Sequence, residues 1–66
     1  MAVLKVIEVL SNSGKSWEDA TAKAVAHASK SVKNIKSVYV QDQSASVKDG
    51  KVTDYRVNLK LTFEVK

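Results

Sequence analysis

The sequence predicts an α+β domain in which one helix packs on a three-stranded antiparallel sheet, in the order strand, helix, strand, strand. Three observations predict it. Apolar and polar residues alternate over residues 55–66, an apolar stripe recurs every three or four residues over 17–33, and an Asp-Gly pair separates the last two strand-like segments. Side chains alternate between the faces of a strand and recur every 3.6 residues in a helix, so the two patterns indicate different structures.

Residues 2–10 are expected to form the first strand. They are rich in β-branched residues, and apolar residues occupy both the odd and the even positions, which face opposite sides of a strand. Only Lys5 and Glu8 are polar. A strand that is apolar on both faces is covered on both sides. Because one helix can cover only one face of a sheet, the other face of this strand requires a partner subunit.

The helix is expected from about Trp17 to about Lys33, after a loop over residues 11–15. Ser16 is a suitable N-cap, and Asp19 stands three residues later as in a capping box. Trp17 opens the apolar stripe and is interpreted as a core or interface anchor rather than as a platform for a ligand. Small residues fill the middle of this stripe, whose members are Trp17, Ala20, Ala24, Ala28, Ser31, Val32 and Ile35.

Two further strands complete the predicted sheet. The second covers residues 37–47, with Val38 and Val40 toward the helix and with Ser37, Tyr39, Gln41 and Gln43 facing away. Residues 48–51 contain the Asp-Gly signal of a tight hairpin. In the third strand, over residues 55–66, one face carries six apolar side chains, namely Tyr55, Val57, Leu59, Leu61, Phe63 and Val65.

The size and composition of the chain point to subunit association. Its 66 residues form one domain over 1–66, without cysteine and with a single histidine, which excludes disulfides and a multi-histidine zinc site within one chain. A chain this short buries only about 60% of its unfolded surface.

The net charge of +4 is spread along the chain, so nucleic acid is not an expected partner. The apolar start lacks the features of a signal peptide, and we expect a soluble, cytoplasmic protein with no membrane partner.

The sequence contains no catalytic signature, and we expect no enzymatic activity. His27 is interpreted as a surface or interface histidine. The segment S-N-S-G-K-S resembles the end of a phosphate-binding loop, but Val9 occupies the position of its first glycine, and a loop with an N-cap explains it. Asp42 could contribute to a hard-cation site if symmetry brought several copies together. Arg56 and Lys60 could attract anionic ligands.

Four segments in order resemble the dodecin family: V-I-E-V-L, S-W-E-D-A, V-K-D-G-K-V and Y-R-V-N-L-K-L-T-F. The resemblance extends from about Lys5 to Lys66. It implies a strand-helix-strand-strand protomer whose sheet wraps partly around its helix, and twelve such protomers in a hollow shell. It also implies a small-molecule ligand, by default a flavin such as FMN or riboflavin.

The positions that bind flavin in this family differ here. Ser37 stands where flavin-binding dodecins have a tryptophan that stacks on the ring, and Arg56 stands where they have a glutamine at the ring edge. Ser44 and Ala45 replace an arginine-glycine pair of bacterial members. We therefore expect weak or absent flavin binding. The S-W-E and Y-R-V segments are more similar to the calcium-type branch, which also lacks the stacking tryptophan.

The resemblance also implies a metal position. Asp42 matches an aspartate that binds metal in archaeal-type dodecins, whereas Lys15 replaces their glutamate near the helix start. Asp42 and Glu8 are therefore the candidate ligands for calcium or magnesium along a channel of the shell. Three functions stay open: a ligand-binding dodecamer with flavin as the default, a calcium-binding or purely structural shell, and a basic module that binds nucleic acid.

Overall fold

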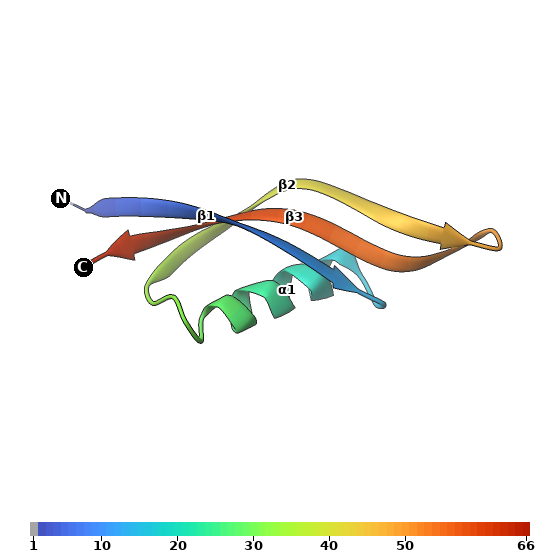
Figure 1. The fold of residues 1–66 in the computed structure, drawn as a ribbon, viewed down its shortest axis with the longest axis horizontal. Helices are drawn as coiled ribbons and strands as arrows, with labels where there is room; N and C mark the ends of the chain where they lie inside the picture. The colour runs from blue at the N-terminus through green and yellow to red at the C-terminus, as the bar shows by residue number, and fades with distance from the viewer. Residues whose placement is uncertain (1) are drawn as a thin grey trace.

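A computed structural model describes residues 2–66 of the chain and confirms the predicted order of elements (Figure 1). Strand β1 spans Val3–Ser13, helix α1 spans Trp17–Ala28, strand β2 spans Ile35–Lys48 and strand β3 spans Lys51–Val65. The predicted domain begins at Met1, which lies outside the described residues. Within residues 2–66, no helix is both long enough and apolar enough to cross a membrane.

The three strands form one antiparallel sheet in the order β1-β3-β2, so β3 is the central strand. Helix α1 lies on one face of this sheet and packs on β1 and β3 (Figure 1). Strand β2 therefore has a sheet partner on one side but little cover from the helix.

The core forms where the apolar face of β3 meets the alanine face of α1. Val57, Leu59 and Leu61 are buried on the strand, and Ala20 and Ala24 are buried on the helix. The predicted alternation of the third strand is thus confirmed, since its polar side chains point away from the helix. Small helical side chains allow the helix to lie close to the sheet, and the partly buried Val9 and Trp17 pack around this contact.

The helix is shorter than predicted, because it ends at Ala28 rather than near Lys33. The Ser29 hydroxyl and the Ser29 backbone N–H both donate to the carbonyl oxygen of Val25, at 2.7 and 2.9 Å. Residues 30–32 form single turns instead. The predicted stripe members Ser31, Val32 and Ile35 consequently lie outside the helix, and Ile35 begins β2.

All three strands are longer than predicted, and β2 spans Ile35–Lys48 rather than residues 37–47. Strand β1 continues through residues 11–13, which the sequence placed in a loop, and the Ser11 hydroxyl donates to the carbonyl oxygen of Ala20 at 2.9 Å. Strand β3 begins at Lys51 because the hairpin loop contains only two residues. Asp49 and Gly50 have φ angles of 53° and 75°, as a type I′ turn requires, so the predicted hairpin is confirmed.

Much of the apolar surface remains uncovered in the single chain. Leu10 is 76% exposed, and Leu4 and Val6 are also exposed on the face of β1 that points away from α1. Among residues 2–66, five apolar side chains are buried, whereas ten large ones are exposed: Val3, Leu4, Val6, Leu10, Val38, Tyr39, Val40, Val47, Val52 and Val65. This excess matches the expectation that the first strand requires a partner on its second face.

Candidate functional site

The face of the sheet that points away from α1, here named the outer face, carries most of the predicted site residues. The antiparallel register arranges its side chains in rows that cross all three strands. Directly opposed side chains in such rows have Cβ atoms roughly 4.5–5.5 Å apart. Each row is given in the strand order β1–β3–β2, starting from the end of the sheet that is next to the start of α1 and going toward the chain termini. The rows are Asn12–Arg56–Ser44, Leu10–Asn58–Asp42, Glu8–Lys60–Tyr39 and Val6–Thr62–Ser37.

A β-bulge decides which way Asp42 faces. Regular alternation from Val40 would turn Asp42 toward the helix, but the register shifts between Val40 and Asp42 and places Asp42 opposite Asn58. The same shift corrects one prediction. Gln43 was expected to face away from the helix, yet it lines a groove between β2 and α1 together with Val38 and Val40.

Asn58 is the residue that sequence reasoning missed at this site. It lies between Leu10 and Asp42 in its row, and its side-chain Oδ1 is buried without a hydrogen-bond donor among residues 2–66. A buried amide oxygen without a donor is uncommon in folded proteins. The sequence marked Asn58 only as one polar residue in an alternating strand, and the absence of a donor becomes visible only in three dimensions.

The charges around Asp42 leave a surplus of negative charge on this part of the outer face. Lys60 is directly opposite Glu8. Arg56 is two residues from Asp54, which accepts hydrogen bonds from the Asn12 side-chain nitrogen at 3.2 and 3.3 Å. The carboxylates of Glu8, Asp42 and Asp54 therefore outnumber the cations of Arg56 and Lys60. Asp42 is exposed and forms no ion pair with any residue within 2–66.

Glu8 and Asp42 do not meet within one chain. They occupy the two outer strands and are separated by β3, which places them roughly 10 Å apart across the sheet. Consistent with this, residues 2–66 contain no group of three or more acidic, histidine or cysteine side chains that could hold a metal ion. Asp42 can thus join a multi-ligand cation site only with residues of other kinds or with other copies.

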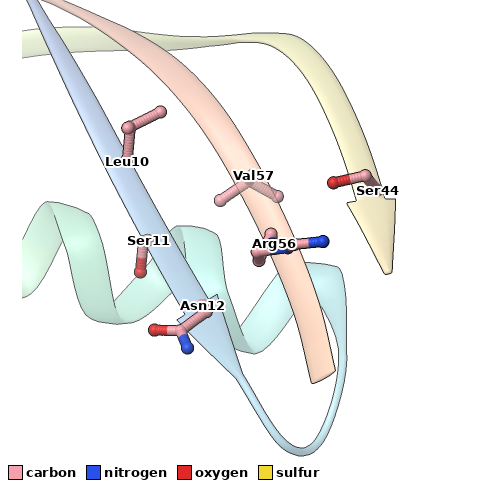
Figure 2. A pocket seen from close by; sticks show the side chains of 6 residues that line it. All are labelled: Leu10, Ser11, Asn12, Ser44, Arg56 and Val57. Atoms are coloured by element: carbon pink, nitrogen blue, oxygen red, sulfur yellow. The ribbon is translucent and has the colours of Figure 1, made fainter. Parts of the chain in front are cut away.

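A pocket of about 420 Å³ surrounds Arg56, and Figure 2 shows the six side chains that line it. Arg56 and Ser44, two of the four family flavin positions, lie together in this pocket. Ser37 is three rows away, roughly 20 Å along β3. Ala45 is paired with Tyr55, on the opposite face from Ser44. One chain therefore assembles only half of the predicted flavin positions.

Trp17 connects the start of the helix to the sheet. Its indole nitrogen donates to the carbonyl oxygen of Ser44 at 2.9 Å, and its ring meets Tyr55 edge to face at a centroid distance of 5.0 Å. The half-buried ring also packs against the core and lines the apolar groove between α1 and β2, which has a volume of about 840 Å³. These contacts fit an anchoring role, although the groove leaves one side of the ring open.

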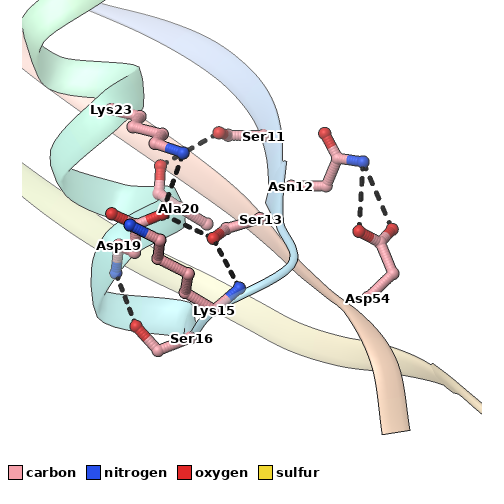
Figure 3. Close-up of polar contacts among 9 residues, drawn as sticks. All are labelled: Ser11, Asn12, Ser13, Lys15, Ser16, Asp19, Ala20, Lys23 and Asp54. Carbon is pink, nitrogen blue, oxygen red and sulfur yellow. Dashed lines mark hydrogen bonds and ion pairs between the residues drawn. The ribbon is translucent and has the colours of Figure 1, made fainter.

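The loop before the helix uses its polar groups internally (Figure 3). The Asp19 backbone N–H donates to the Ser16 hydroxyl at 2.9 Å, and the Ser13 hydroxyl donates to the Asp19 carboxylate. Lys23 forms an ion pair with the same carboxylate at 3.1 Å. The bond from Ser13, followed by Lys23, lowers the pKa of Asp19 below its usual 3.8. The backbone N–H of Lys15 donates to the Ser13 hydroxyl at 3.0 Å, so these polar groups serve the loop and the helix cap, in agreement with the structural interpretation of this segment.

A family model described as Dodecin matches residues 3–66. The chain belongs to the dodecin family. It is 40% identical over 67 residues to the calcium dodecin of Mycobacterium tuberculosis (strain ATCC 25618 / H37Rv), an alignment that covers 100% of this chain and 93% of that relative.

Solved dodecin structures share the fold. Dodecin from Streptomyces coelicolor superposes with a TM-score of 0.92 at 28% identity, covering 98% of this chain and 93% of that one. A Thermus thermophilus protein reaches 0.93 at 24% identity, with 100% and 97% coverage. The M. tuberculosis calcium dodecin, described as calcium chelating with a novel calcium-binding site, gives 0.82 at 38% identity, with 97% and 91% coverage. The β-α-β-β architecture predicted from the sequence is that of dodecins.

Replacing Trp17 with alanine is expected to destabilise this dodecin fold. The variant loses the packing of a large ring and the bond to Ser44, which together cost about 3 kcal/mol. The melting temperature, followed by circular dichroism, should fall by well over 10 °C in so small a domain. Trp17→Phe keeps a ring and should lose only about 1 kcal/mol. A Trp17→Ala variant that melts like the wild type would show that the ring does not anchor the helix.

The bonds to Asp19 are expected to make stability depend on pH. Because its pKa is lowered in the folded protein, the ionised carboxylate stabilises the fold above pH 3.8, and this contribution disappears as the pH falls through the lower folded value. Urea midpoints of wild type and Asp19→Asn should therefore differ at pH 6 and converge toward pH 2. Ser13→Ala should reduce the difference. A gap that stays constant with pH would contradict this account.

Proposed function

We propose that the chain is a non-catalytic subunit of a hollow dodecameric shell, and that this shell binds calcium through Asp42. The observation that carries the proposal is the bulge that turns Asp42 outward, opposite Asn58, on a part of the sheet with surplus negative charge. The 40% identity to a calcium dodecin supports the same ligand. Magnesium is less well suited, because it requires a tighter and more regular octahedral set of ligands.

The assembly supplies what one chain lacks. Exposed large apolar side chains outnumber buried ones, and further copies of the same chain are the partners that would cover them. Calcium takes six to eight oxygen ligands, whereas one chain offers a single free carboxylate in this row. Copies of Asp42 around a symmetry axis, together with water, would complete such a site.

Flavin is the second candidate ligand. The pocket around Arg56 offers a cation and hydrogen-bonding groups, but Ser37 provides no ring on which an isoalloxazine could stack. Nucleic acid fits the outer face poorly, because its carboxylates interrupt any basic stripe.

Asp42→Asn is expected to weaken calcium binding by at least tenfold, since it removes the negative charge that holds the ion. Isothermal titration of the chelator-treated native oligomer with calcium chloride measures this change. Asp49→Asn is the matched control, because it makes the same chemical change in the hairpin turn, where asparagine suits the positive φ. A wild type that takes up no calcium, or an Asp42→Asn variant with wild-type affinity, would refute the proposed function.

Ser37→Trp is expected to strengthen riboflavin binding by about two- to tenfold, which is the contribution of aromatic stacking beyond burial. Quenching of riboflavin fluorescence measures the affinity of wild type and variant. Ser37→Leu adds apolar area without a ring and should gain less. Nanomolar affinity of the wild type would show that Ser37 is not the residue that limits flavin binding.

A further inference from the structure

The β2–β3 hairpin extends beyond the rest of the fold as a two-stranded arm. Strand β1 pairs with β3 only as far as Tyr55, and Trp17 at the start of α1 contacts Ser44 and Tyr55. The hairpin arm, residues 46–53, therefore continues past both the third strand and the helix (Figure 1). An isolated two-stranded hairpin is at best marginally stable in water. The elements within residues 2–66 leave this arm uncovered.

The hairpin arm exposes one apolar pair and one cationic pair. Val47 is directly opposite Val52, so the two valines lie on one face, and they are 67% and 48% exposed. Lys48 is directly opposite Lys51, and neither lysine forms an ion pair with another residue within 2–66. Like charges that are directly opposed on adjacent strands destabilise the pairing. A surface that is apolar and carries a carboxylate would stabilise both pairs.

The groove between α1 and β2 has these two properties. It has a volume of about 840 Å³, and its lining is mostly apolar, with Val38 and Val40 on the strand and Ala22 and Val25 on the helix. Glu18 also lines this groove, is exposed, and forms no ion pair within residues 2–66. The arm of the same chain cannot fill the groove, because the arm lies beyond the start of α1 whereas the groove runs along the helix (Figure 1).

We propose that the hairpin arm of one copy lies in the α1–β2 groove of a neighbouring copy, a contact that rests on the proposed assembly of the chain. Val47 and Val52 of the arm pack on the apolar lining of the groove. Lys48 or Lys51 forms an ion pair with Glu18, which relieves the repulsion between the two lysines. Because arm and groove are separate surfaces of one chain, every copy can give an arm and receive one, and repetition around a symmetry axis closes a ring.

The shape of the chain favours another copy as the occupant. The chain measures 51 × 20 × 13 Å, and its radius of gyration is 13.6 Å, whereas a compact domain of this length has about 11 Å. Its solvent-accessible area is 4873 Å², about 750 Å² more than the roughly 4,100 Å² of a compact 7.2 kDa monomer. A standard interface removes roughly 800 Å² from each partner. The surplus area is therefore of the size that contact with another copy covers.

Cysteine crosslinking tests this contact directly, because the chain contains no cysteine of its own. Val47→Cys places a thiol on the arm, and Ala22→Cys places one in the groove. Treating the native oligomer of this double variant with a short bismaleimide should convert most chains into covalent dimers or larger species on a denaturing gel. The matched control combines Val47→Cys with Lys23→Cys, on the flank of α1 that faces β1, and should leave most chains monomeric on the gel.

Light scattering of each particle before crosslinking separates this inference from the proposed function. A particle of twelve chains in which Val47→Cys and Ala22→Cys give no covalent dimers, or no more than the control, would overturn the arm contact and leave the shell. A wild type that is monomeric at micromolar concentration would overturn both. Efficient crosslinking in a particle that takes up no calcium would support the contact and refute only the calcium site. If Ala22→Cys prevents assembly, Val52→Cys combined with Gln43→Cys, on the strand side of the groove, decides in the same way.

Discussion

The burial of one face of β3 against the alanine face of α1 is the interaction on which the rest of the structure depends. Leu59 and Leu61 are fully buried there, and Ala20 allows the helix to approach closely. Because β3 is also the central strand, its register with both neighbours fixes every row of the outer face. The same alternation that buries its apolar side chains therefore presents its polar ones, Asn58 included, to the candidate site.

One helix of twelve residues is too small to cover a sheet made of three long strands. It packs on β1 and β3 and leaves a wide apolar groove beside Val38 and Val40. The opposite face of β1 is equally uncovered at Leu10. We expect copies of the chain to supply the missing cover. The proposed ligand site on the outer face would then lie where copies approach one another, so the proposed assembly and the proposed site involve the same face of the sheet.

The sequence predicted the features that depend on local patterns. Alternation located the core face of β3, the Asp-Gly pair located a type I′ turn, and Ser16 was recognised as the helix N-cap. The sequence did not predict the bulge after Val40, because cross-strand pairing and not local composition determines it. That one shift turned Gln43 toward the helix and Asp42 away from it. The unsatisfied oxygen of Asn58 was equally out of reach, since it depends on which groups surround the side chain in space.

The mass of the native particle tests most directly the claim that copies of the chain cover its apolar surface. Size-exclusion chromatography with multi-angle light scattering, at micromolar concentration, should give a single species of twelve times the 7.2 kDa chain mass. A folded monomer that persists at that concentration would contradict the account, because its exposed apolar side chains would then have no partner.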